Sequence, residues 1–179
     1  KYKLNRILIV DWDLHHGNGT QNSFYSSSEV LFFSMHQYPY YPGTGSFDET
    51  GEKDGRGFTI NVPLSGGQGD KDYVFVMKEI LEPVAYQFKP QFILVSAGYD
   101  IHHLDPLGTM KVTPWGFYEM TKILLKLARE ICEGKILFTL EGGYHIAGIT
   151  ESVKSTIYAL IDKNYEQLNN ESVEGSKST

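Results

Sequence analysis

The sequence lacks several features that define common classes of protein. Its single cysteine, Cys132, among 179 residues excludes an internal disulfide framework and suits a reducing compartment. No apolar stretch reaches the roughly 18 residues of a membrane-spanning helix. No basic run occurs and the formal net charge is −6, which argues against a nucleic-acid-binding surface. We therefore expect a protein of the cytoplasm, or of the nucleus if the organism is eukaryotic, that contacts neither membrane nor nucleic acid directly.

What is present suits one folded domain. Hydrophobic residues make up 41% of the chain and aromatic residues 13%, which is enough for a core. Cys132 falls late in an apolar helical pattern, so we expect a buried, inert thiol. The chain has no initiating methionine and runs almost at once into a buried strand. We therefore expect it to be part of a longer chain.

Short apolar runs alternate with amphipathic stretches along most of the sequence. The predicted strands are 6–10, 30–36, 58–62, 92–96 and 135–140, and the predicted helices are 20–25, 70–88, 113–132 and 149–161. This alternation predicts an α/β fold, with a mostly parallel sheet flanked by helices. We expect this domain to occupy residues 1–162, and residues 163–179, rich in Asn, Glu, Ser, Gly and Lys, to be a disordered tail.

Two segments invite more specific expectations. In the helix predicted over 70–88, Asp70 is a good N-cap and Pro83 should produce a kink. Residues 37–57 form a long loop without periodicity, rich in Gly, Pro and Tyr. Its aromatic content favours a functional loop over a disordered one.

Potential metal ligands follow the first predicted strand at alternate positions. Asp11, Asp13 and His15 come directly after an apolar run, and alternate residues of an extended backbone point to the same side. Asp100 and Tyr144 follow two other predicted strands. Because ligands gather at the carboxyl ends of parallel strands, we expect these side chains to meet. The alternative for an aspartate after a strand is an ordinary turn former or helix cap.

The residue types suggest a catalytic metal site. Asp13, His15 and Asp100 would supply oxygen and nitrogen ligands for zinc, or else iron, and leave a position open for water and substrate. Tyr144 could donate a hydrogen bond to the oxyanion of a tetrahedral intermediate; the alternative is an ordinary packed tyrosine. The preceding glycines, Gly142 and Gly143, would allow close approach of backbone or ligand.

Three other histidines are expected to have less direct roles. His16 should point away from His15 in an extended backbone, so we expect it to support the site rather than to bind metal. His102 and His103 follow Asp100 on a predicted loop, and we expect them at the surface or the rim of the site.

Taken together, the motifs resemble the zinc-dependent histone deacetylase family, which has the arginase/deacetylase fold. The matching segments, in order, are Asp-Trp-Asp-Leu-His-His-Gly-Asn-Gly-Thr-Gln (11–21), Tyr-Pro-Gly-Thr-Gly (41–45), Ser-Ala-Gly-Tyr-Asp with Asp-Pro-Leu-Gly (96–108) and Leu-Glu-Gly-Gly-Tyr (140–144). The residues in these motifs are most similar to those of class II deacetylases and their bacterial relatives. The resemblance extends to about residue 161.

The resemblance implies roles for individual residues. Asp13, His15 and Asp100 match the zinc ligands, and Tyr144 matches the hydrogen-bond donor to the transition state. Asp11 and Ser34 match positions that hold a structural monovalent cation, usually potassium. Tyr41 and Leu107 match the walls of the narrow channel that admits the acyl-lysine side chain, and we expect Gly142 and Gly143 to border it.

One feature of the family is missing from the match. The family's general base and its partner are a tandem histidine pair in an N-terminal segment, and His15-His16 is not that pair. We therefore expect the chain to be the C-terminal part of the catalytic domain, with an incomplete sheet. Alone, it is expected to be inactive or poorly folded.

The resemblance leaves other functions open. An acetylpolyamine amidohydrolase or an acetoin-utilisation-type deacetylase would share these motifs, and the acidic charge suits a polyamine equally well. A domain of weak activity that binds acyl-lysine or acts as a scaffold is a further alternative. The expected partners are thus an acetylated protein or an acetylated polyamine, with a homo-oligomer left open.

Overall fold

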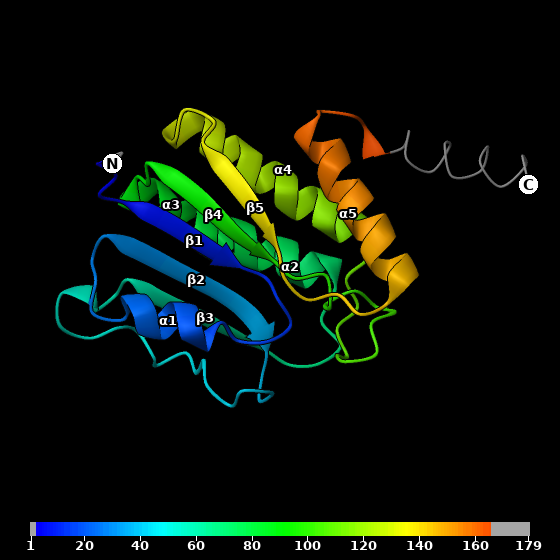
Figure 1. Cartoon of the computed structure of the whole chain (residues 1–179), viewed down its shortest axis with the longest axis horizontal. Helices are drawn as coiled ribbons and strands as arrows, with labels where there is room; N and C mark the ends of the chain where they lie inside the picture. Colours follow the sequence, from blue (N-terminus) through cyan, green and yellow to red (C-terminus); the bar gives the residue numbers. More distant parts are fainter. Residues whose placement is uncertain (1–2, 166–179) are drawn as a thin grey trace, which may run out of the picture.

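The computed structural model describes residues 3–165, which form a parallel sheet covered by helices. The strands are β1 (Ile7–Asp11), β2 (Val30–Gln37), β3 (Thr59–Leu64), β4 (Phe92–Ala97) and β5 (Ile136–Leu140). They lie in the order β3-β2-β1-β4-β5, and every neighbouring pair is parallel (Figure 1). The predicted parallel α/β fold is confirmed.

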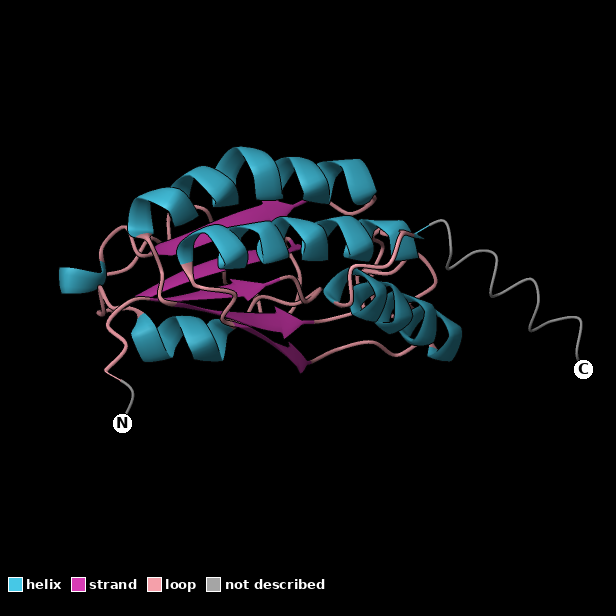
Figure 2. Cartoon of the chain, turned by 90° about the horizontal axis from the view of Figure 1, so that it is seen from above, coloured by secondary structure: helices cyan, strands magenta, loops and turns pink. Residues whose placement is uncertain are grey.

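Helices lie on both faces of the sheet. They are α1 (Asn18–Phe24), α2 (Asp70–Val76), α3 (Glu82–Phe88), α4 (Pro114–Ile131) and α5 (Ile146–Leu160), with a 3₁₀ turn η1 (Lys53–Gly55) and a π-helical segment η2 (Met77–Leu81). Figure 2 shows α2, α3 and α4 together on one face and α1 on the opposite face. The last helix, α5, packs against α4.

The central strand β1 is buried on both faces. Leu8 and Val10 belong to the large core under α2 and α4, whereas Ile9 packs with Phe32 in a smaller cluster that includes Phe24 of α1. Because successive residues of a strand point to opposite faces, a strand covered on both sides needs an unbroken apolar run. This run leads into the polar residues that follow the strand.

The helical region 70–88 differs in detail from the expectation. It stays helical throughout, but η2 precedes the turn that contains Pro83. Proline has no N–H for the usual helical hydrogen bond, and a π-helical segment accommodates a local change in that pattern. The N-cap is Gly69, and Asp70 is already the first helical residue. Asp70 accepts hydrogen bonds instead from the backbone N–H and hydroxyl of Thr113, each at 2.7 Å.

Two further expectations concern the C-terminal region. The last helix begins at Ile146 rather than at residue 149. The predicted tail, 163–179, lies outside the described residues except for its first positions, where Tyr165 places its ring 5.4 Å from that of Tyr118. Within the described part of the chain, no helix is long and apolar enough to cross a membrane.

Candidate metal centre and active site

The candidate site lies where the strand order reverses. From β1, the sheet extends through β2 and β3 on one side and through β4 and β5 on the other. Such a switch point leaves a crevice outside the carboxyl ends of the two central strands. Asp13 follows β1 and Asp100 follows β4, so the topology places both carboxylates at this crevice.

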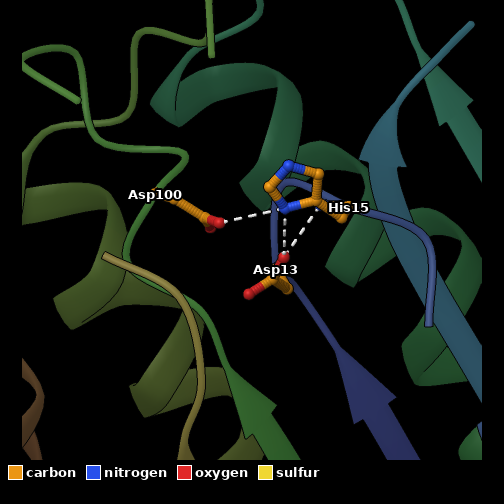
Figure 3. A group of neighbouring side chains, drawn as sticks. All are labelled: Asp13, His15 and Asp100. Atoms are coloured by element: carbon orange, nitrogen blue, oxygen red, sulfur yellow. Dashed lines mark hydrogen bonds and ion pairs between the residues drawn. The ribbon is translucent and has the colours of Figure 1, made fainter. Parts of the chain in front are cut away.

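The three expected zinc ligands converge there (Figure 3). The Nδ1 atom of His15 is 3.1 Å from Oδ1 of Asp13 and 3.3 Å from Oδ2 of Asp100. One ligand atom from each residue lies within 4.8 Å of the other two. The sequence prediction that these side chains meet is therefore correct, and metal binding itself remains a prediction.

Backbone hydrogen bonds orient the acidic side chains. Oδ1 of Asp100 accepts a hydrogen bond from Leu14 N at 2.9 Å, and Oδ1 of Asp13 accepts one from His15 N at 2.8 Å. The other oxygen of Asp100 is buried without a hydrogen-bond partner. Burial raises the pKa of Asp100, and the carboxylate of Asp100 beside the His15 ring raises the pKa of that imidazole.

This donor set fits a zinc ion. A buried carboxylate oxygen without a partner is costly, and here it faces an imidazole nitrogen and a second carboxylate. Two carboxylates and one histidine are ligands that zinc accepts, and they would leave one coordination position open. The donor set is thus compatible with zinc, and the metal itself stays a prediction.

Two glycines allow the strand ends to approach this closely. A Cβ atom on Gly98 would lie 2.3 Å from Oδ2 of Asp13, and one on Gly142 would lie 2.2 Å from Oδ2 of Asp100. Any side chain at either position would displace a candidate ligand.

The expected monovalent-cation residues lie side by side below this site. Asp11 pairs in register with Ser34 on β2, and both are buried. Asp11 accepts a hydrogen bond from Asp13 N at 3.0 Å, and Ser34 Oγ lies 3.0 Å from Nδ1 of His36. Burial raises the pKa of Asp11 well above its usual range. No lysine or arginine among residues 3–165 pairs with Asp11, so a bound cation could balance its charge.

Tyr144 lines a cavity with two of the candidate ligands. The cavity has a volume of about 390 Å³, and Asp13, His15, Gly142 and Tyr144 are among its walls. The tyrosine side chain is well exposed. The pKa of its phenol is raised, mainly by partial desolvation and to a smaller extent by the negative charge of the nearby carboxylates. The phenol is therefore protonated near neutral pH, as a hydrogen-bond donor must be.

Of the residues expected along the channel, Gly142 lines this cavity, whereas Tyr41 and Leu107 lie outside it. Tyr41 is 76% exposed and Leu107 is 42% exposed. The ring of Tyr41 is 6.1 Å from that of His15, and the Tyr40 ring is 5.7 Å away. The Tyr40 hydroxyl donates a hydrogen bond to the carbonyl of Leu107. Sequence reasoning missed Tyr40, although it sits directly beside Tyr41.

Behind the site, a buried polar network anchors the long loop. His16 contacts neither candidate acidic ligand: its ring nitrogens lie 2.7 Å from Thr44 Oγ1 and 3.0 Å from Gln21 Oε1. Gln21 donates in turn to Glu49, whose carboxylate also accepts the backbone N–H groups of Gly45 and Ser46. The loop that carries Tyr40 and Tyr41 is thereby fixed to the segment after β1 and to α1.

The prediction for His102 is wrong. This residue is 2% exposed and stacks between His103 and Phe117, with ring centroids at 4.3 and 6.5 Å. An imidazole can pack as a flat ring, and burial lowers the pKa of His102 to about 4, so it stays neutral. His103 is exposed, as expected.

A residue that sequence reasoning overlooked joins two parts of the site. Asp105 is buried, and its carboxylate oxygens accept hydrogen bonds from Leu107 N at 3.0 Å and from Tyr144 N at 2.7 Å. Its position before Pro106 gives the only sequence signal, one typical of a turn.

Comparisons with known proteins agree with this arrangement. The histone deacetylase domain family matches residues 1–160. A probable deacetylase of Archaeoglobus fulgidus is 48% identical over 148 residues, which cover 83% of this chain and 41% of that protein. Histone deacetylase 15 of Arabidopsis thaliana is 46% identical over 165 residues, which cover 90% of this chain and 29% of that protein.

Solved structures that are similar to this chain are also deacetylases. The crystal structure of the HDA15 HD domain superposes with a TM-score of 0.85 at 45% identity, over 90% of this chain and 45% of that one. The histone deacetylase Clr3 superposes with a TM-score of 0.86 at 40% identity, over 90% of this chain and 28% of that one. This chain thus spans less than half the length of each of these relatives. It belongs to the histone deacetylase domain family.

Proposed function

We propose that the protein containing this chain is a zinc-dependent amidohydrolase that removes acetyl groups from acetylated lysine. The observation that carries the proposal is the convergence of Asp13, His15 and Asp100, with one carboxylate oxygen buried and unpartnered, beside a cavity lined by Tyr144. Membership of the deacetylase family supports the reaction type, and the names of the relatives suggest acetylated protein as the substrate.

Each group in the site then has a chemical role. Zinc held by the three ligands would polarise the amide carbonyl and lower the pKa of bound water. Tyr144 would donate its phenolic hydrogen to the oxyanion that forms as the carbonyl is attacked. The side chains of Tyr40, Tyr41 and Leu107 would contact the methylene stem of the lysine.

The general base is not assigned to any described residue. Both ring nitrogens of His16 are engaged with Thr44 and Gln21, and His102 is stacked in the core. The family's tandem histidine pair is not matched by His15-His16. We therefore expect full turnover from a protein that also contains that pair.

An acetylated polyamine is the second candidate substrate. The net charge of −6 favours a cationic substrate without distinguishing a lysine-containing peptide from a polyamine. Competition between an acetyl-lysine peptide and acetylspermidine for the same enzyme would separate the two.

The proposal is tested by acetate release together with zinc content. In the full-length protein, Tyr144→Phe should keep stoichiometric zinc and lower kcat by about 100- to 1,000-fold, because only stabilisation of the oxyanion is removed. Tyr86→Phe is the matched control, since this phenol lies on α3, bonded to Glu130. An unchanged rate in Tyr144→Phe would contradict the assigned role, and absence of zinc from the wild-type protein would contradict the proposal as a whole.

A further inference from the structure

The Tyr144 side chain has little to hold it in place. It is 59% exposed, and no hydrogen bond to its phenol occurs among residues 3–165. It lies in the loop between β5 and α5. The direction of the phenol must therefore be set largely by the backbone that carries it.

Three hydrogen bonds fix that backbone. Gly142 donates to Oδ2 of Asp13 at 2.9 Å, and its carbonyl accepts from Tyr99 N at 2.7 Å. Tyr144 N then donates to Oδ2 of Asp105 at 2.7 Å. Between these anchors lies Gly143, whose φ of +139° is open to glycine and rare for other residues. The bond to Asp105 restrains the Tyr144 N–H itself, directly beyond this permissive glycine.

Asp105 also belongs to the channel side of the site. Its Oδ1 atom accepts the Leu107 N–H at 3.0 Å, and the Leu107 carbonyl accepts the Tyr40 hydroxyl. The Tyr40 ring lies 5.7 Å from that of His15. A single buried carboxylate therefore connects the loop of Tyr144 to the segment that faces the candidate ligand His15.

We propose that Asp105 is a positioning residue: its carboxylate holds the Tyr144 backbone so that the phenol faces the metal site, in fixed relation to the Leu107 wall. The inference rests on the proposed function, because it concerns the orientation of the residue assigned there as oxyanion donor. Asp105 acts through Tyr144 and contacts neither substrate nor metal.

Replacing Asp105 by asparagine should keep one of its two hydrogen bonds and remove the other. Its side-chain oxygen can still accept the Leu107 N–H, which lies two residues ahead as in an ordinary Asx turn. Its amide nitrogen would then face the Tyr144 N–H, so two donors would oppose each other. Asp105→Asn should thus release Tyr144 and leave the channel wall in place.

The test combines kinetics, zinc content and hydrogen exchange in the full-length protein. Asp105→Asn should lower kcat by about 100-fold, since a displacement of about 1 Å can have an effect of this size. KM for an acetyl-lysine peptide should stay within about twofold, because the channel wall is retained. Zinc should remain stoichiometric, and the Tyr144 amide should exchange its hydrogen faster. The matched control is Asp72→Asn, which changes an exposed aspartate on α2 that accepts Gly69 N at 2.9 Å and does not line the cavity.

Unchanged kcat and unchanged exchange in Asp105→Asn would overturn the proposal, as would a rise in KM at constant kcat. If that variant does not fold, hydrogen exchange in the wild-type protein still tests the proposal. A Tyr144 amide that exchanges as fast as that of an unstructured peptide would refute the anchoring by Asp105. If the wild-type protein releases no acetate, the proposed function fails, while the exchange comparison still shows whether Asp105 holds Tyr144.

Discussion

The two carboxylate oxygens of Asp100 have different surroundings. One oxygen accepts the Leu14 N–H at 2.9 Å and so joins the segment after β1 to the segment after β4. The other is buried and without a hydrogen-bond partner, 3.3 Å from Nδ1 of His15. Leaving such an oxygen unpaired costs about 1–3 kcal/mol or more, and a metal ion would supply the missing interaction.

Asp100→Ala should therefore abolish stoichiometric zinc binding. The substitution removes one of three ligands, and the two that remain hold zinc too weakly for it to survive dialysis. The measurement is zinc content of the purified full-length variant after dialysis against buffer without metal. Asp54→Ala, an exposed carboxylate in η1, is the control and should keep its zinc. Stoichiometric zinc in Asp100→Ala would refute its assignment as a ligand.

The residues that could be predicted from the sequence are those whose positions follow from the strands. Asp13, His15 and Asp100 directly follow apolar runs, so a parallel sheet brings them together. Asp105 was missed because its contact with Tyr144, 39 residues away, depends on how two loops fold over each other. His102 was misplaced for a similar reason, since only the position of Phe117 on α4 shows that the imidazole is covered.

At the scale of elements, one carboxylate connects the beginnings of α2 and α4. Thr113 is the N-cap of α4, but its side chain makes no capping hydrogen bond. Instead, both its backbone N–H and its hydroxyl donate to Asp70 of α2, each at 2.7 Å. Gly116 allows this contact, because a Cβ there would lie 2.3 Å from Oδ1 of Asp70. The prediction that Asp70 is the N-cap of its own helix is wrong, because Gly69 holds that position. The Asp70 carboxylate instead accepts hydrogen bonds from the start of α4, a contact that the local sequence pattern does not reveal.

Asp70→Ala should lower the free energy of unfolding by about 2 kcal/mol, because two hydrogen bonds to a charged, partly buried acceptor are lost. Urea denaturation of the zinc-loaded protein measures the change. Asp48→Ala, at an exposed loop position, should stay within about 0.5 kcal/mol of wild type. If Asp70→Ala is equally harmless, the link between α2 and α4 contributes little to stability.

At the scale of the whole molecule, the edge strand β5 is sparsely covered. Within residues 3–165, β5 pairs only with β4. Ile136 and Phe138 pack against the core, so Leu137 points to the opposite face, where it is 52% exposed. On that face α1 contacts β2 and leaves this part of the sheet open (Figure 2). Parallel sheets are normally covered on both faces, and the relatives are more than twice as long as the matched region.

An open strand with exposed leucines is a template for pairing with another chain, so this chain, produced alone, should self-associate through β5. Leu137→Lys should weaken that association by at least about tenfold, since a charge on the open face of an edge strand opposes sheet extension and apolar contact. Light scattering coupled to size-exclusion chromatography, over a range of protein concentrations, measures the association. Phe75→Lys, at a 63% exposed position on α2, removes an apolar side chain that is at least as exposed as Leu137 and should leave the association unchanged. A wild-type chain that stays monomeric at high concentration, or an equal effect of both substitutions, would show that β5 is not the associating surface.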